Sequence, residues 1–287
     1  MSKEYHFYDK PIIYDSYANR IKRIVTSALL FLIAFILTTL IYHSLLAAIA
    51  TVLGYEIKFS FTRLEVLPHQ IKYWSLPRTI LIYVVPSVVM LTLAIIVAIL
   101  LHKYKNIITL FRMFWLWLSV CLFTTFSTHL ITAAIGIASP RTAFYTAFAI
   151  PFVWMGFPAA LGAVLSIAGV VVSMIWGFVT VNEFLRFAFS GSLLKARTAR
   201  IYFVTQFYVL PLVVALPFVG LLTLSNVTVY YLSIYFSFLC IALGMFLRFY
   251  NASGAVRCNK ADVLNVISPL VIIVAAALFI TVKFLLK

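Results

Sequence analysis

Long apolar runs separated by short polar segments divide the chain into a series of predicted membrane-spanning helices. The first run, residues 26–55, contains no Asp, Glu, Lys or Arg. A helix needs about 20 apolar residues to cross a bilayer, so this run must tilt or extend past the bilayer edge. The pattern predicts an all-α, polytopic helical membrane protein with about seven transmembrane helices. The further runs lie at about 79–101, 107–137, 159–181, 201–224, 229–248 and 265–286.

One segment between the first two runs has a different period. Ile57, Phe59 and Phe61 alternate with polar residues, which is the two-residue period of a strand. Pro68 interrupts any helix there. We therefore expect a short strand-like interfacial segment near 56–76.

Helix-breaking residues also separate the third run from the fourth. Proline and glycine at 140, 151, 156 and 158 favour a broken or re-entrant segment there over a full crossing. The fourth run has small residues at helical spacing, which give it a face for close packing against other helices. These residues are Gly162, Ser166, Gly169, Ser173 and Gly177.

Basic residues are distributed unequally between the predicted loops. With the N-terminus in the cytoplasm, fifteen Lys and Arg residues fall on the cytoplasmic side and seven on the other. Cytoplasmic loops carry such an excess, so we expect residues 1–23 to form a cytoplasmic head and 24–287 a single membrane-embedded domain. The expected location is the bacterial inner membrane. Four of the seven lie in 58–78, and a return of that segment to the cytoplasmic face would change the number of crossings.

Composition supports the membrane assignment and indicates which class of partner the protein has. The 287 residues are 64% hydrophobic and 10% charged, whereas soluble domains carry about 25% charged residues. The formal net charge is +15, and in loops beside a membrane it favours anionic lipid headgroups as partners, not nucleic acid. The three cysteines, Cys121, Cys240 and Cys258, are too dispersed for a CxxC metal site.

Polar side chains within two predicted helices form the candidate binding site. Those of the first helix lie near its middle, and those of the third lie on one helical face, so together they would line a polar pocket inside the membrane. The alternative is that they form ordinary hydrogen bonds between helices. With Glu183 added from the end of the fourth helix, the candidates are Thr39, Tyr42, His43, Thr125, Thr128, His129, Thr132 and Glu183.

These residues do not predict catalytic or metal chemistry. No Asp or Glu occurs between Glu65 and Glu183, so the first three helices lack both the general base of a zinc hydrolase and a carboxylate pair. His43 and His129 without a third ligand make a poor metal site. At i,i+3 spacing, Glu183 can form an ordinary membrane-edge ion pair with Arg186. We expect no cofactor, no metal and no catalytic residue.

The layout of residues 26–180 bears on function as well. Tyr-His-Ser-Leu-Leu-Ala-Ala at 42–48 precedes Leu-Gly-Tyr-Glu-Ile at 53–57, which turns into strand-like sequence, and Pro86 opens the second run. This layout resembles the membrane core of site-2-type intramembrane metalloproteases. The HExxH motif of that family is absent, because the five residues beginning at Tyr42 contain one His and no Glu. The resemblance therefore implies the scaffold without the protease.

Three functional hypotheses follow. The first is a non-enzymatic, protease-like scaffold that lacks zinc and acts as a binding or complex subunit, with other membrane protein subunits as partners. The second is a transporter or lipid-handling protein, suggested by the broken region and the polar faces of two helices. The third, an enzyme acting on a lipid through His43, His129 or Glu183, ranks last because no partner base is apparent.

Overall fold

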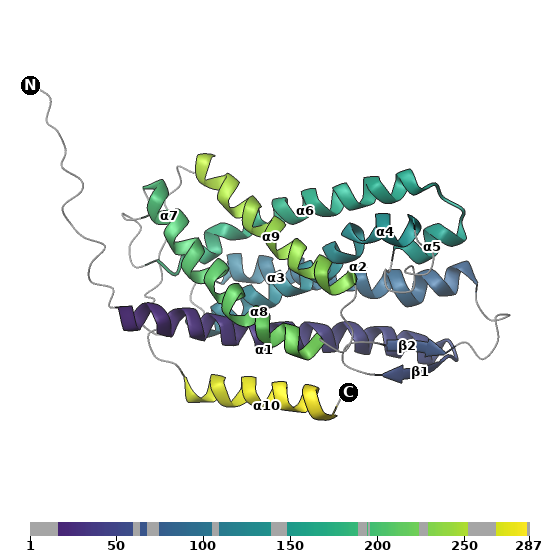
Figure 1. The fold of residues 1–287 in the computed structure, drawn as a ribbon, viewed down its shortest axis with the longest axis horizontal. Helices are drawn as coiled ribbons and strands as arrows, with labels where there is room; N and C mark the ends of the chain where they lie inside the picture. Colours follow the sequence, from purple (N-terminus) through teal and green to yellow (C-terminus); the bar gives the residue numbers. More distant parts are fainter. Residues whose placement is uncertain are drawn as a thin grey trace, which may run out of the picture.

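The structure, a computed structural model, is a bundle of helices with one short hairpin at an end (Figure 1). It describes residues 17–59, 64–67, 75–104, 109–138, 148–188, 194, 196–223, 229–251 and 268–285. Within these residues, 6 helical spans are long and apolar enough to cross a membrane, and a shorter apolar helix, Pro269–Phe284, follows. The predicted all-α, polytopic membrane fold is confirmed.

The described helices follow the predicted runs closely. Two of the spans are interrupted: α3 and α4 are separated at Thr132, and a π-helical turn, η5, joins α7 to α8. The helices are α1 (Tyr17–Val52), α2 (Leu76–Lys103), α3 (Thr109–Ile131), α4 (Ala133–Ala138), α5 (Ala149–Trp154), α6 (Ala159–Leu185), α7 (Arg197–Val204), η5 (Thr205–Val209), α8 (Leu210–Thr223), α9 (Val229–Asn251) and α10 (Pro269–Leu285).

Helix α1 begins earlier than the sequence predicted. It starts at Tyr17, inside the segment 1–23 that we expected to form a polar head. The first turns pack against the bundle: the Arg20 guanidinium lies 5.6 Å from the Tyr202 ring centroid, and Arg23 is fully buried. Because Tyr202 of α7 lies over Arg20 and Arg23 is fully buried, the helix continues through these basic residues. The residues before Tyr17 lie outside the described part of the chain.

The strand-like segment forms a two-stranded antiparallel hairpin. Strands β1 (Glu56–Phe59) and β2 (Leu64–Leu67) pair in the register Glu56↔Leu67. Gly54 has φ of 82°, a left-handed conformation that favours glycine, and it turns the chain from α1 into β1. The hairpin lies at the end of α1 (Figure 1), and the rest of the predicted segment, up to Trp74, falls outside the described residues.

The described part of the predicted broken region is too short to cross a membrane. Helix α5 has 6 residues, and the chain then turns at Gly156, whose φ is 67°. Pro158, in an extended conformation, precedes α6. Residues 139–147 of this region lie outside the description.

Small residues bring α6 and α9 into backbone contact, as the small-residue face of the fourth run predicted. A Cβ atom added to Gly177 would lie 1.9 Å from the carbonyl oxygen of Ile241 on α9. A Cβ atom on Gly244 of α9 would lie 1.9 Å from the carbonyl oxygen of Met174 on α6. Because Gly177 and Gly244 have no side chains, the backbones of the two helices are in direct contact where they cross.

Aromatic side chains fill the centre of the bundle. Trp117 of α3 is fully buried, stacks on Tyr208 of η5 at 5.2 Å between ring centroids, and meets Phe31 of α1 edge-on. Its indole N–H donates to the Ser27 hydroxyl at 2.9 Å, and the Tyr208 hydroxyl donates to the Phe238 carbonyl at 3.0 Å. These contacts fix α1, α3, η5 and α9 relative to one another, and a pocket lies among three of these helices.

Candidate functional site

A small pocket lies between α1, α3 and α9. The space in it that a water molecule can occupy is about 20 Å³, enough for about one ordered water. The described lining contains hydroxyl groups, aromatic rings, a histidine and a cysteine, but no Asp, Glu, Lys or Arg. The lining residues are Phe35, Thr38, Thr39, Tyr42, His43, Cys121, Thr124, Thr125, Tyr230, Tyr231, Ile234 and Phe238.

The structure brings together polar residues of the two helices that the sequence singled out. Thr39, Tyr42 and His43 of α1 line the pocket with Thr125 of α3. His129 is buried beside it, with its ring centroid 5.2 Å from that of Tyr42. The candidate residues of the first and third helices therefore meet in space.

The two remaining α3 candidates are buried outside the described lining. Thr128 and Thr132 are both 0% exposed. The Thr132 hydroxyl donates to the Thr128 carbonyl at 2.9 Å, at the point where α3 ends and α4 begins. For Thr132 this is the ordinary structural role that the sequence left open, a hydroxyl bonded to its own helix. The Thr128 hydroxyl has no hydrogen-bond partner among the described residues.

Two further threonines, Thr38 and Thr124, carry the most informative feature of the pocket. Threonine in a helix often donates to the carbonyl four residues earlier, and the neighbouring Thr39 and Thr125 do so at 3.0 and 3.1 Å. The hydroxyls of Thr38 and Thr124 have no hydrogen-bond partner among the described residues, although each side chain is only 2% exposed. A buried hydroxyl without a partner costs about 1–3 kcal/mol. Both hydroxyls belong to the pocket lining, where a bound molecule could satisfy them.

Helix α9 completes the pocket with residues that the sequence did not single out. Tyr230 and Tyr231 line it, and the Tyr230 ring lies 4.9 Å from the His129 ring, centroid to centroid. The His129 ring is thus in contact with a tyrosine from α1 and another from α9. Adjacent tyrosines at a helix start are typical of a membrane interface, so their sequence pattern does not distinguish a ligand site.

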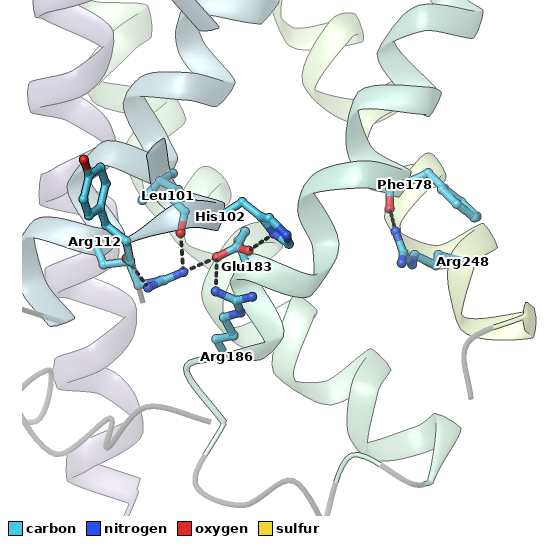
Figure 2. Close-up of polar contacts among 8 residues, drawn as sticks. Leu101, His102, Arg112, Phe178, Glu183, Arg186 and Arg248 are labelled. Atoms are coloured by element: carbon cyan, nitrogen blue, oxygen red, sulfur yellow. Dashed lines mark hydrogen bonds and ion pairs between the residues drawn. The ribbon is translucent and has the colours of Figure 1, made fainter. Parts of the chain in front are cut away.

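Glu183 belongs to a separate, buried ion cluster at the end of α6 (Figure 2). Arg112 of α3, 1% exposed, donates to the Glu183 carboxylate and to the Leu101 carbonyl, the latter at 2.9 Å. Arg186 approaches the same carboxylate to 3.2 Å, and His102 lies 3.7 Å from its other oxygen. Burial lowers the pKa of the Arg186 guanidinium, while Glu183 raises it and Arg112 lowers it.

The structure therefore places Glu183 away from the pocket in which the sequence analysis included it. Its partner Arg112 and the pocket neighbour His129 are seventeen positions apart on α3, which corresponds to about 25 Å. The i,i+3 pair with Arg186 forms as predicted, and Arg112 adds a second cation from another helix. Arg112 also binds carbonyls at the end of α2, so this cluster joins three helix termini.

The two polar clusters thus lie far apart along the bundle. Buried hydroxyls without a partner among the described residues occur in the pocket lining, at Thr38 and Thr124, and also outside it, at Thr26 and Thr128. Within the part of the chain that the structure describes, no three His, Cys, Asp or Glu side chains are grouped so that they could hold a metal ion. No protein family model, curated protein or solved structure matches the chain.

Proposed function

We propose that this integral membrane protein is a non-enzymatic binding subunit whose pocket between α1, α3 and α9 holds a small ligand. The observation that carries the proposal is the pair of buried hydroxyls on Thr38 and Thr124, which belong to the lining of one pocket and lack partners among the described residues. Small-molecule sites are concave and combine apolar walls with a few polar groups. This pocket has that composition.

The position of the carboxylates supports a role without catalysis. Glu183 is the only acidic residue in the described membrane-crossing helices. It forms ion pairs with Arg112 and Arg186, about 25 Å from His129. The histidines at the pocket therefore have no carboxylate from these helices beside them to act as a general base.

We extend this proposal to a site-2-protease-like scaffold without zinc. Its support is the order of elements, in which α1 is followed by the hairpin and by α2 with Pro86. Metal analysis of the purified protein is expected to find less than stoichiometric zinc. A stoichiometric zinc content that is lost in His43→Ala would overturn this part of the proposal.

The accessibility of Cys121 tests the binding site. Cys121 lines the pocket, whereas Cys240 is equally buried, at 1% against 2% exposure, and does not belong to the lining. In two full-length variants that each retain one of these cysteines, with Cys258 also replaced, methyl methanethiosulfonate is expected to label Cys121 at least about tenfold faster. Equal, slow labelling of both cysteines would show that the pocket is closed to solutes.

Transport is the second candidate function, favoured by the interrupted spans. The break between α3 and α4 lies three residues from His129, and η5 interrupts another span; discontinuous helices often adjoin substrate sites. The same labelling distinguishes the two functions if it is repeated in sealed vesicles with an impermeant thiol quencher on one side. A binding site gives labelling from one face, whereas a pathway gives labelling from both.

We also propose a bacterial inner-membrane location with the N-terminus in the cytoplasm. The starts of α1, α3 and α7 meet the ends of α2, α6 and α9 at one end of the bundle (Figure 1), and Arg20, Arg112 and Arg200 lie there. Basic residues gathered at one end of the bundle favour the cytoplasmic face for that end. They also favour anionic lipid headgroups as partners. Other membrane protein subunits would complete the complex. The pocket lies beyond the midpoint of α1, so labelling of Cys121 in cells is expected from the external face.

A further inference from the structure

A basic side chain, Arg248 of α9, lies on the outer surface of the bundle near the crossing of α9 and α6. Figure 2 shows it apart from the Glu183 cluster. Its guanidinium donates to the Phe178 carbonyl of α6 at 2.5 Å and lies 4.8 Å from the centroid of the Phe178 ring. The exposed side chains along these parts of both helices are apolar, and lipid covers such a surface in a membrane protein. They are Val171, Ile175, Phe178, Val179, Leu239, Leu243 and Leu247.

No carboxylate among the described residues pairs with this cation. The ion pairs between described residues all involve Glu183 and its partners Arg112, Arg186 and His102. The Phe178 carbonyl and ring attract the guanidinium, but neither carries a net charge. A guanidinium that faces lipid without a counter-charge is costly, so Arg248 favours a negatively charged ligand from outside the chain. Its N–H groups that are not bonded to Phe178 can donate to that ligand.

The position of the contact along the helices limits which anion can reach it. Helix α6 has 27 residues, so it is about 40 Å long, whereas the hydrocarbon core of a bilayer is about 30 Å thick. Phe178 lies about 10 Å along the helix from the last residue of α6, Leu185. Arg248 itself lies one turn from the end of α9. The guanidinium is therefore close to the boundary between the hydrocarbon and the headgroups, where lipid phosphates lie.

We propose that Arg248 binds the phosphate of an anionic phospholipid on the surface of α6 and α9, while the ring and carbonyl of Phe178 hold the guanidinium in place. A planar guanidinium donates two parallel hydrogen bonds to a phosphate, and its contact with the ring leaves other N–H groups available for them. A zwitterionic lipid brings its own cation, so it compensates the charge less well. The inference rests on the anionic headgroups proposed above as partners and assigns them to one side chain. It does not depend on the pocket, whose lining lacks Arg248.

Native mass spectrometry of the full-length protein in detergent measures this binding. Delipidated protein is titrated with phosphatidylglycerol, with phosphatidylcholine and with diacylglycerol, which lacks the phosphate. The first phosphatidylglycerol is expected to bind about fivefold more tightly than phosphatidylcholine, and diacylglycerol is expected to bind most weakly. Arg248→Gln is expected to weaken phosphatidylglycerol binding by about tenfold.

Two further variants separate the assigned contact from general charge and from unfolding. Lys22→Gln removes an exposed positive charge from the start of α1, at the same end of the bundle, and is expected to change the affinity by less than about twofold. Phe178→Leu retains the guanidinium and the backbone carbonyl but removes the ring. It is expected to weaken phosphatidylglycerol binding by about threefold. Its melting temperature without added lipid should equal that of the parent, because the Phe178 side chain is 39% exposed.

The outcomes distinguish a wrong site from a wrong partner class. Equal affinities for phosphatidylglycerol and phosphatidylcholine in the parent would overturn both the inference and the anionic headgroups as partners. A preference for phosphatidylglycerol that Arg248→Gln and Lys22→Gln reduce equally would overturn only the site at Arg248. If Arg248→Gln does not fold, Phe178→Leu decides, and unchanged lipid affinity in that variant overturns the site.

Discussion

Replacing Glu183 with Gln is expected to lower the melting temperature of the purified protein by about 10 °C. The Arg112 guanidinium is 1% exposed and donates to the Glu183 carboxylate, so the substitution leaves a buried cation without its counter-charge. Removal of one partner of a buried ion pair costs about 3–5 kcal/mol. Thermal unfolding in detergent, followed by circular dichroism, measures the effect.

Two other members of the cluster, Arg186 and Arg112, provide the controls. Arg186→Gln is expected to have a smaller effect, because Arg186 is 13% exposed on its side chain and Glu183 retains Arg112. The double variant Arg112→Leu with Glu183→Leu should be more stable than Glu183→Gln, since the most deeply buried cation is then removed together with its partner. A Glu183→Gln protein that melts within 2 °C of the parent, on the order of 1 kcal/mol or less, would contradict the assigned pair.

Replacing Gly177 with Ala is expected to destabilise the protein by about 3 kcal/mol or more, although alanine is the better helix former. The new Cβ atom would lie 1.9 Å from the Ile241 carbonyl oxygen, which is backbone and cannot rotate away. Helices α6 and α9 must separate, and the packing around their crossing is lost. Melting temperature and protease resistance of the full-length variant measure this effect.

Gly220→Ala is the matched control for this substitution. Gly220 lies in α8, and a Cβ atom added there meets nothing within 4 Å. The same chemical change should therefore leave stability unchanged or raise it by up to about 1 kcal/mol. Equal melting temperatures for the two variants would show that α6 and α9 do not cross in backbone contact.

The ion cluster and the glycine crossing each position a helix that lines the pocket, although the ion cluster itself lies about 25 Å from His129 along α3. The first joins the ends of α2 and α6 to the start of α3, and the second fixes α9 against α6. Helices α3 and α9 both line the pocket, so their positions depend on these contacts.

Patterns along the chain predict the membrane fold, the crossing segments, the hairpin and the small-residue face of α6. Each of these depends on local properties: hydropathy over about 20 residues, a period of two or of 3.6, and proline or glycine at an interruption. The predicted beginning of α1 was late because the basic residues before residue 24 read as polar loop. Arg23 is nevertheless buried, and Arg20 lies over the Tyr202 ring of α7, a contact that the local sequence does not reveal.

Which polar residues meet, and which of them form hydrogen bonds, depends on how the helices pack against one another. Thr38 and Thr39 are neighbours of one residue type, yet only Thr39 donates to its own helix, because rotamer and surroundings depend on the facing helices. The Tyr230 ring contacts the His129 ring from another helix, and Arg112 pairs with Glu183, which is 71 residues away in the chain. Hydropathy places a helix in the membrane but does not fix its rotation about its axis, and that rotation determines which side chains line the pocket.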